Sequence, residues 1–201
     1  MSPHGTDAYL DVTGLPPLVA RAVSAARQAG FGNSCLPAHG RLLQLLAGGV
    51  GAGAIGETGT GCGVGLAWLA SGARPGVRLV SVEQDGRRAG LARSVFADVP
   101  AVTVLHGDWR ELQASGPFEL LAMDGGGQGK HAGDPALGPR AWLAPGGTLV
   151  LDDFTPVAGW PPMRDGRPDT ARLHWLQHPD LLATQIRTQP DACSIVAVLA
   201  G

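Results

Sequence analysis

The sequence has little of what marks disulfide-linked, zinc-binding, nucleic-acid-binding or membrane proteins. Its three cysteines are odd in number, far apart and without a Cys-x-x-Cys pair. Neither a disulfide framework nor a zinc knuckle is indicated, and a reducing, cytoplasmic setting is expected. Lysine occurs once and the fifteen basic residues are scattered, so we expect no nucleic-acid partner and no membrane surface. There is no charged-then-apolar leader and no run of about 18 apolar residues, which argues against secretion and membrane insertion.

Length and charge favour one domain. The chain has 201 residues and a net charge of -2, and domains commonly contain about 100 to 200 residues. We expect a single domain over residues 1–201, with an N-terminal helical cap segment over residues 1–50 and a core over residues 51–201. Asparagine occurs once, whereas alanine, glycine, proline and arginine abound, a composition typical of a GC-rich bacterial genome.

One glycine-rich stretch organises the rest of the chain. Residues 54–66 read AIGETGTGCGVGL, which predicts a short strand, a glycine turn and the start of a helix. Glycines in such a turn let a ligand approach the bare backbone, while the helix N-terminus offers N–H groups to an anionic part of that ligand. Tight packing of the strand on the helix is the alternative reason for these glycines. The dinucleotide fingerprint G-x-G-x-x-G does not fit, because its third glycine would fall on Val64 or Leu66, so hydride chemistry is disfavoured.

Strand and helix patterns alternate after the glycine turn. This alternation predicts a parallel sheet covered on both faces, and therefore the α/β fold class. The expected strands cover residues 77–82, 102–108, 118–123 and 147–151, with a closing antiparallel hairpin over residues 183–189 and 194–200. Acidic side chains stand at the strand ends: Glu83, Asp108, Asp124, Asp152 and Asp153. Since the carboxyl ends of parallel strands form one rim where ligands bind, we expect these acids to converge.

The residues Glu57-x-Gly59-x-Gly61-x-Gly63 resemble motif I of the class I S-adenosylmethionine-dependent methyltransferases, and the general resemblance extends from Leu36 to Val198. It implies a Rossmann-like, doubly wound, seven-stranded sheet that is mostly parallel with a C-terminal antiparallel hairpin. It also implies S-adenosyl-L-methionine as the methyl donor.

Several of these residues have an expected task in holding that donor. Glu83 is placed to accept hydrogen bonds from two ribose hydroxyls, the alternative being a solvated turn acid. Asp108 beside Trp109 suits an adenine, which needs its amino group bound and its face stacked, with simple packing as the alternative for Trp109. Glu57 is expected to orient the amino end of the methionine moiety. The predicted cofactor site consists of Glu57, Gly59, Thr60, Gly61, Gly63, Glu83, Gly107, Asp108, Trp109 and Asp124.

Two further frames, FELLAMDGGG and LAPGGTLVLDDF, resemble the metal-dependent O-methyltransferases, the catechol and caffeoyl-CoA O-methyltransferase group. The resemblance implies that Asp124, Asp152 and Asp153 hold a divalent cation, usually Mg²⁺. Carboxylate oxygens suit such hard cations, and the frames contain no His or Cys, which argues against zinc. Asp153 stands where the group has asparagine, so the site would carry three carboxylates; a solvated turn acid is the alternative for Asp153.

The residue that serves as catalytic base in this group has no direct counterpart in the chain. The group's lysine, three residues past the first metal ligand, is replaced by Gly127, while Lys130 and His131 follow a few residues later. We expect one of this pair to accept the proton of the attacked hydroxyl, histidine being better matched near neutral pH. Mobile loop residues are the alternative for both.

Segments that border the site are expected to control access. Residues 154–168 are proline-rich and carry aromatic side chains, which predicts a lid for a flat acceptor. Asp134 followed by proline predicts the start of a helix toward Trp142. Three polar residues of the N-terminal segment either line the site or serve as turn and cap residues: Asn33, Ser34 and His39.

The sequence therefore predicts an enzyme, a metal-assisted O-methyltransferase acting on a small phenolic or catechol-like hydroxyl. Two alternatives remain open: a metal-independent small-molecule methyltransferase of the same fold, and a protein that binds S-adenosylmethionine without turnover. The expected partner is a small-molecule acceptor. The identity of that acceptor and the oligomeric state stay open, a homodimer being one alternative.

Overall fold

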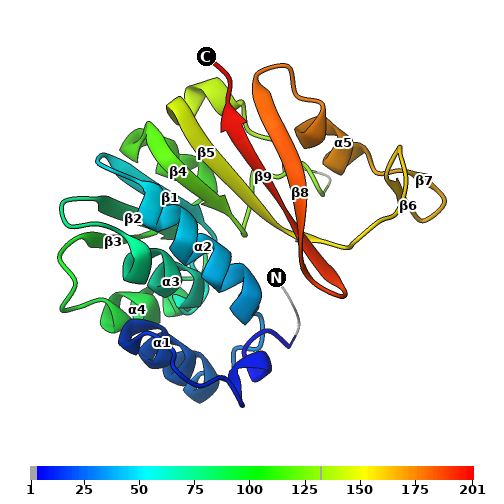
Figure 1. Cartoon of the computed structure of the whole chain (residues 1–201). Coiled ribbons are helices and arrows are strands. Elements are labelled where there is room, and N and C mark those ends of the chain that lie inside the picture. The colour runs from blue at the N-terminus through cyan, green and yellow to red at the C-terminus, as the bar shows by residue number, and fades with distance from the viewer. Residues whose placement is uncertain (1–3, 132) are drawn as a thin grey trace.

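A seven-stranded sheet lies at the centre of the part of the chain that the computed structural model describes, residues 4–131 and 133–201 (Figure 1). The strands are β1 (Ala54–Thr58), β2 (Arg78–Glu83), β3 (Val102–His106), β4 (Phe118–Met123), β5 (Leu143–Phe154), β8 (Leu181–Gln189) and β9 (Ala192–Leu199). Their order is β3-β2-β1-β4-β5-β9-β8, and neighbours are parallel except β9, which is antiparallel to β5 and β8. The predicted fold class, the mostly parallel sheet and the C-terminal antiparallel hairpin are confirmed.

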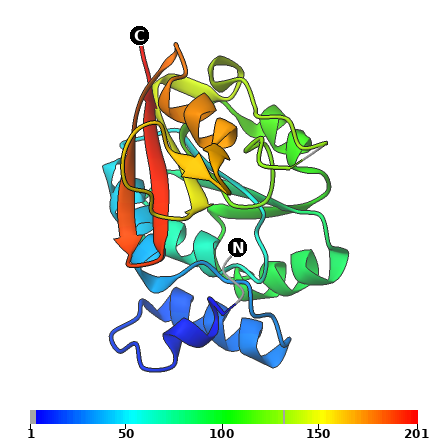
Figure 2. The ribbon, with the colours of Figure 1, turned by 90° about the vertical axis from the view of Figure 1, so that its right-hand side faces the viewer.

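Helices cover both faces of this sheet, each face over its own apolar core (Figure 2). Residues of a strand alternate between the two cores, as Ala54 and Ile55 do in β1, because successive side chains point to opposite faces. One face carries η1 (Asp7–Tyr9), α1 (Pro17–Gln28), α2 (Pro37–Gly49), α3 (Val64–Gly72) and α4 (Gly86–Val95). The other carries η2 (Trp109–Ser115), η3 (Pro139–Ala141) and α5 (Thr170–Leu176). None of the helices in the described residues has the length and apolar character needed to cross a membrane.

Glycines let α2 and α3 pack at close range. A side chain at Gly40 of α2 would overlap the indole of Trp68, and one at Gly72 of α3 would overlap the backbone of Gln44. Two helices without these side chains can approach closely enough to bury the indole completely. The close packing holds the first turn of α2, which carries His39, against the sheet.

The predicted helix from Asp134 toward Trp142 is wrong. Residues 133–138 are described and form no helix, and only the short turn η3 precedes Trp142. The carboxylate of Asp134 accepts a hydrogen bond from the backbone N–H of Gly127 at 2.7 Å. It therefore closes the glycine-rich loop after β4 and is not available to cap a helix.

The proline-rich segment after β5 contains a short antiparallel hairpin, β6 (Met163–Arg164) and β7 (Arg167–Pro168). Arg172 of α5, which is fully buried, holds the base of this segment. Its guanidinium donates to the backbone carbonyl of Thr155 at 2.6 Å and to the carboxylate of Asp169 at 3.1 Å. The segment is thus tied at both ends beside the rim of the sheet, and its function as a lid stays a prediction.

Candidate active site

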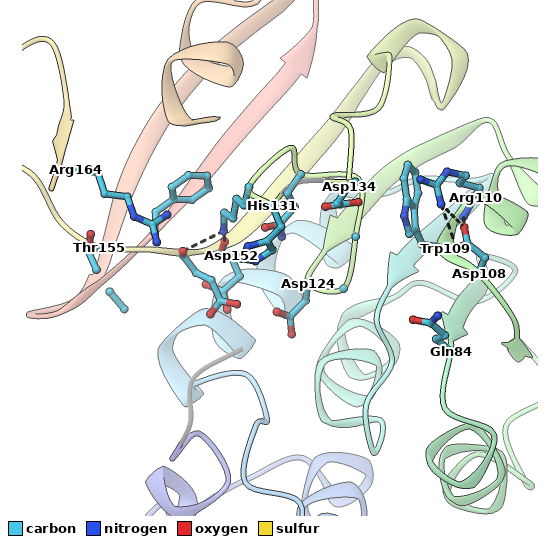
Figure 3. A pocket seen from close by; sticks show the side chains of 18 of the residues that line it. Gln84, Asp108, Trp109, Arg110, Asp124, His131, Asp134, Asp152, Thr155 and Arg164 are labelled. Carbon is cyan, nitrogen blue, oxygen red and sulfur yellow. Dashed lines mark hydrogen bonds and ion pairs between the residues drawn. The ribbon is translucent and has the colours of Figure 1, made fainter. Parts of the chain in front are cut away.

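A cavity of about 750 Å³ opens at the carboxyl ends of the central strands (Figure 3). Its walls come from the loops after β2 and β4, the start of η2, the end of β5, the turn between β8 and β9, and the hairpin of β6 and β7. Asp124 and Asp152 face its middle, Trp109 stands at one end and Arg164 at the other. The rim that the strand-end acids predicted therefore carries a ligand-sized space.

Three carboxylates approach one another at the floor of this cavity. One oxygen from each of Asp124, Asp152 and Asp153 lies within 4.8 Å of the other two. Successive residues of a regular strand point to opposite faces. The register of β5 against β9, however, shifts between Leu151 and Phe154, and Asp153 has a φ of 63°. This bulge brings two neighbouring acids to the same site.

The environment of the three carboxylates suits a hard divalent cation. Burial, and after it the charge of Asp152, raises the pKa of Asp124 to about 7. Carboxylates this close repel one another unless a cation lies among them, and Mg²⁺, Ca²⁺ and Mn²⁺ prefer carboxylate oxygens. The donor set fits the cation that the two sequence frames imply.

Lys130 reaches the same cluster from the loop after β4. Its Nζ donates hydrogen bonds to the backbone carbonyls of Asp152 and Asp153, and lies 3.9 Å from the ring centroid of Phe154. Burial lowers the pKa of Lys130 to about 8, against the opposing effect of Asp152. His131 is exposed at the cavity wall. Of the two expected proton acceptors, the structure brings Lys130 against the acids and leaves His131 at the wall.

The glycine turn borders a narrow recess that adjoins the cavity at Asp124. Glu57 is buried there, its Oε2 accepts a hydrogen bond from Ser81 Oγ at 2.6 Å, and burial raises the pKa of Glu57 to about 8. Gly63 lies outside the lining, where it precedes α3 with a left-handed φ and where a side chain would press on Phe96. Predicted site residues that line the recess are Asn33, Ser34, Glu57, Gly59, Thr60, Gly61 and Asp124.

Glu83 lies behind the glycine turn and does not line the cavity. Its Oε2 accepts a hydrogen bond from the N–H of Gly61 at 2.7 Å. Its Oε1 accepts from Arg88 Nη2 at 2.8 Å and from the N–H of Asp85 at 2.9 Å. The carboxylate thus ties the glycine turn to β2 and α4, and its expected ribose contact stays a prediction. Gly107 is also absent from the lining residues.

Asp108 and Trp109 stand at one end of the cavity together with Gln84 (Figure 3). Asp108 caps η2, and its carboxylate pairs with the guanidinium of Arg110 at 3.0 Å. The indole of Trp109 lies 4.6 Å from that guanidinium and 5.6 Å from the ring of Trp142. The indole is therefore both a packing element and part of the cavity wall.

Several lining residues carried no motif in the sequence. Gln84 and Phe154 each follow an acid at a strand end, so adjacency to those acids was the signal that could have found them. Others come from loops whose path no local pattern reveals: Arg110, Gln128, Thr155 and Arg164. For His39 the sequence allowed two functions, lining the site or capping a turn. The structure places it outside the cavity lining, in contact with Asp152. Burial lowers the pKa of His39, although Asp152 opposes this effect.

Comparisons with known proteins identify the family of this chain. The methyltransferase domain family matches residues 57–154, from the glycine turn to the end of β5. The chain is similar to the catechol O-methyltransferase of Mycobacterium tuberculosis, with 32% identity over 93% of this chain and 90% of that protein.

Solved structures share the fold over nearly the whole chain. The cofactor-bound protein Rv0187 from MTB matches with a TM-score of 0.73 and 27% identity, covering 99% of this chain and 98% of that one. The O-methyltransferase from Bacillus cereus in complex with SAH matches with a TM-score of 0.72 and 21% identity, covering 97% of this chain and 96% of that one. At 21% identity, the match to the Bacillus cereus protein shows a shared fold and nothing more.

Proposed function

The chain belongs to the S-adenosylmethionine-dependent O-methyltransferase family, and from this premise we propose that it methylates a small phenolic or catechol-like hydroxyl with the help of a divalent cation. The observation that carries the proposal is the cluster of Asp124, Asp152 and Asp153 at the floor of the large cavity. The cluster adjoins the recess of the glycine turn, so a methyl donor and an acceptor would meet beside it.

Residues that line the recess and the cavity offer partners for the two ends of an elongated methyl donor. A carboxylate at Glu57 suits the cationic amino end of the methionine moiety. The indole of Trp109, at the far end of the cavity, suits the flat face of an adenine. Asp124 borders both spaces, which supports a reacting centre close to the acid cluster.

A divalent cation held by the three carboxylates would lower the pKa of an acceptor hydroxyl and fix two vicinal oxygens of the acceptor. In the transfer, the bond between the methyl carbon and the acceptor oxygen forms as the carbon–sulfur bond breaks. S-adenosylhomocysteine is released, and the hydroxyl proton passes to the protein. Positioning of this kind contributes on the order of 7 to 11 kcal/mol in favourable cases.

Lys130 is the proposed proton acceptor. Its Nζ is held beside the acids by the carbonyl of Asp153 at 3.0 Å and by the ring of Phe154. His131 follows it directly, but its side chain is exposed and lies at the cavity wall. A base must lie within hydrogen-bond reach of the proton it takes, and the geometry favours Lys130 for that reason.

A catechol-like acceptor agrees with the chemistry of the cavity lining. The M. tuberculosis relative is named a catechol O-methyltransferase. Here the acid cluster suits two adjacent oxygens, and Phe154 borders the cavity next to it. Thr155 and Arg164 continue the wall toward the hairpin of β6 and β7.

Isothermal titration calorimetry tests the proposal in three steps. S-adenosylmethionine is titrated first, then Mg²⁺, then catechol, with the wild-type protein and with the double variant Asp152→Ala/Asp153→Ala. The proposal expects both proteins to bind the methyl donor and only the Mg²⁺-loaded wild type to bind catechol. Equal catechol binding with and without Mg²⁺, and in the wild type and the double variant, would favour a metal-independent methyltransferase. No binding of the methyl donor would contradict the whole proposal.

A further inference from the structure

A buried histidine and a buried serine contact one of the three acids from outside the cavity. His39 Nδ1 lies 2.8 Å from Ser194 Oγ and 3.3 Å from Asp152 Oδ1. Ser194 Oγ lies 3.4 Å from the same carboxylate oxygen. All three residues are at most 5% exposed. They come from α2, β9 and β5, three elements that are far apart in the chain.

The hydrogen-bond donors among His39, Ser194 and Asp152 are the histidine and the serine. An ionised carboxylate only accepts hydrogen bonds, whereas an imidazole N–H and a hydroxyl donate. With a proton on Nδ1, His39 donates to the Ser194 hydroxyl, and that hydroxyl donates to Oδ1 of Asp152, so the two hydrogen bonds run in series. Ser194 Oγ and His39 Nδ1 both lie against Oδ1, so Oδ2 is the oxygen that Asp152 can present to the cavity.

Asp152 needs support of this kind because it lies in an irregular part of β5. The ladder between β5 and β9 is interrupted there, so the strand alone does not set the direction of the side chain. The nearby carboxylates of Asp124 and Asp153 repel it. Lys130 contacts the backbone carbonyls of the bulge and not this side chain. The side chain of Asp152 is held by α2 and β9.

We propose that His39 and Ser194 are positioning residues of the cation site, which hold Oδ1 of Asp152 so that Oδ2 faces the cation. This inference rests on the metal-assisted reaction proposed above. Helix α2 belongs to the N-terminal segment that precedes the core, and through His39 it would also support the metal centre. Removing a group that supports a metal ligand in this way typically weakens metal binding about 10- to 100-fold.

The test measures Mg²⁺ affinity by calorimetry in the absence of methyl donor and acceptor. Ser194→Ala removes one donor, and His39→Leu removes the other with little change in volume. His39→Asn keeps an N–H group near the place of Nδ1 and is the conservative variant. Ser71→Ala is the matched control, because it removes a hydroxyl that donates to the carbonyl of Ala67 within α3, away from the acids.

The inference expects the Mg²⁺ dissociation constant to rise about 10- to 100-fold in Ser194→Ala and in His39→Leu, and to change less than about threefold in His39→Asn and Ser71→Ala. The affinity for S-adenosylmethionine stays at the wild-type value in all four. Wild-type Mg²⁺ affinity in Ser194→Ala and His39→Leu overturns the inference. Parallel losses of Mg²⁺ and methyl-donor affinity overturn it too, because they report a general loss of structure.

Two further outcomes separate this inference from the proposed function. If the wild-type protein binds no Mg²⁺, the proposed function fails and the inference fails with it. If the wild type binds Mg²⁺ and the variants bind it equally well, only the inference fails. Should His39→Leu not fold, Ser194→Ala decides the question alone, because it deletes a single oxygen from a strand position.

Discussion

The turns that follow β1 and β4 meet at Gly59 and Gly125. A Cβ atom at Gly59 would lie 2.5 Å from the Cα of Gly125, closer than side chains approach a backbone, and Gly59 has a φ of 84°. Gly59 borders the recess, whereas Gly125 follows the first acid of the cluster, Asp124. The two parts of the site are therefore joined by a backbone contact that requires glycine on both sides.

Gly59→Ala should separate these turns. The added methyl group meets both left-handed strain and a backbone clash, so we expect a loss of unfolding free energy of about 3 kcal/mol or more. Gly76→Ala is the matched control, because Gly76 has a similar φ of 89° but nothing within 4 Å of the added Cβ. Strain alone should cost that variant about 1 to 2 kcal/mol. Urea unfolding measures both, and equal losses would contradict the proposed clash.

The pKa of Glu57 makes stability depend on pH. Burial raises this pKa from its ordinary value of 4.5 to about 8. The unfolded chain therefore gives up the proton first, and the contribution of Glu57 is complete below pH 4.5 and is lost as pH rises toward 8. The loss amounts to at most about 5 kcal/mol, since one pKa unit corresponds to about 1.4 kcal/mol.

Urea unfolding at pH 5 and pH 8 checks this contribution in the cofactor-free protein. Other carboxyl groups also titrate, so the informative quantity is the difference between the wild-type protein and Glu57→Gln. The wild type should lose more unfolding free energy between the two pH values than the variant does. Parallel changes in the two proteins would show that Glu57 ionises at its ordinary pKa.

Arg172→Met should destabilise the segment between β5 and α5. The guanidinium bonds the Asp169 carboxylate and the Gln185 side chain, so its loss leaves a buried carboxylate without its cation. Removing one partner of a buried ion pair costs about 3 to 5 kcal/mol. Arg140→Met is the control, because Arg140 pairs with Asp180 at the surface and should cost less than about 1 kcal/mol. A loss as small as that of the control, measured by urea unfolding, would refute the anchoring function.

Lys130→Met and His131→Ala distinguish the two expected proton acceptors. Loss of the base should lower kcat for catechol methylation about 100-fold or more in Lys130→Met. The affinity for S-adenosylmethionine should stay unchanged, because the proposed contacts of the methyl donor are with Glu57 and Trp109 and not with Lys130. His131→Ala should keep kcat near the wild-type value. A large loss in His131→Ala with a normal Lys130→Met would assign the base to the histidine.

The sheet and the site rim could be predicted from sequence because their signals are local. β-branched runs and strand-end acids repeat at regular intervals, and parallel strands bring their ends together. Glu57, Asp124 and Asp152 therefore came to one edge as expected. Glu83 did not enter the cavity wall, because the turn and α4 compete for its oxygens.

The remaining features depend on contacts between distant segments. Asp153 joins Asp152 at one site only through a bulge in β5, which no residue pattern marks. His39 and Ser194 meet across 155 positions of the chain. Asp134 carried a local signal for a helix start, but the backbone N–H of Gly127 in the folded loop after β4 donates to its carboxylate instead. In each case tertiary packing, and not local preference, decides the outcome.

Methyl transfer itself tests the central claim most directly. The protein is stripped of metal with EDTA and incubated with catechol and S-adenosylmethionine labelled in its methyl group, and labelled methylated catechol is measured before and after Mg²⁺ is restored. The account predicts product only after Mg²⁺ is added, and none with Asp152→Ala/Asp153→Ala. Product formation at the same rate in EDTA and in the double variant would contradict a cation held by the three aspartates.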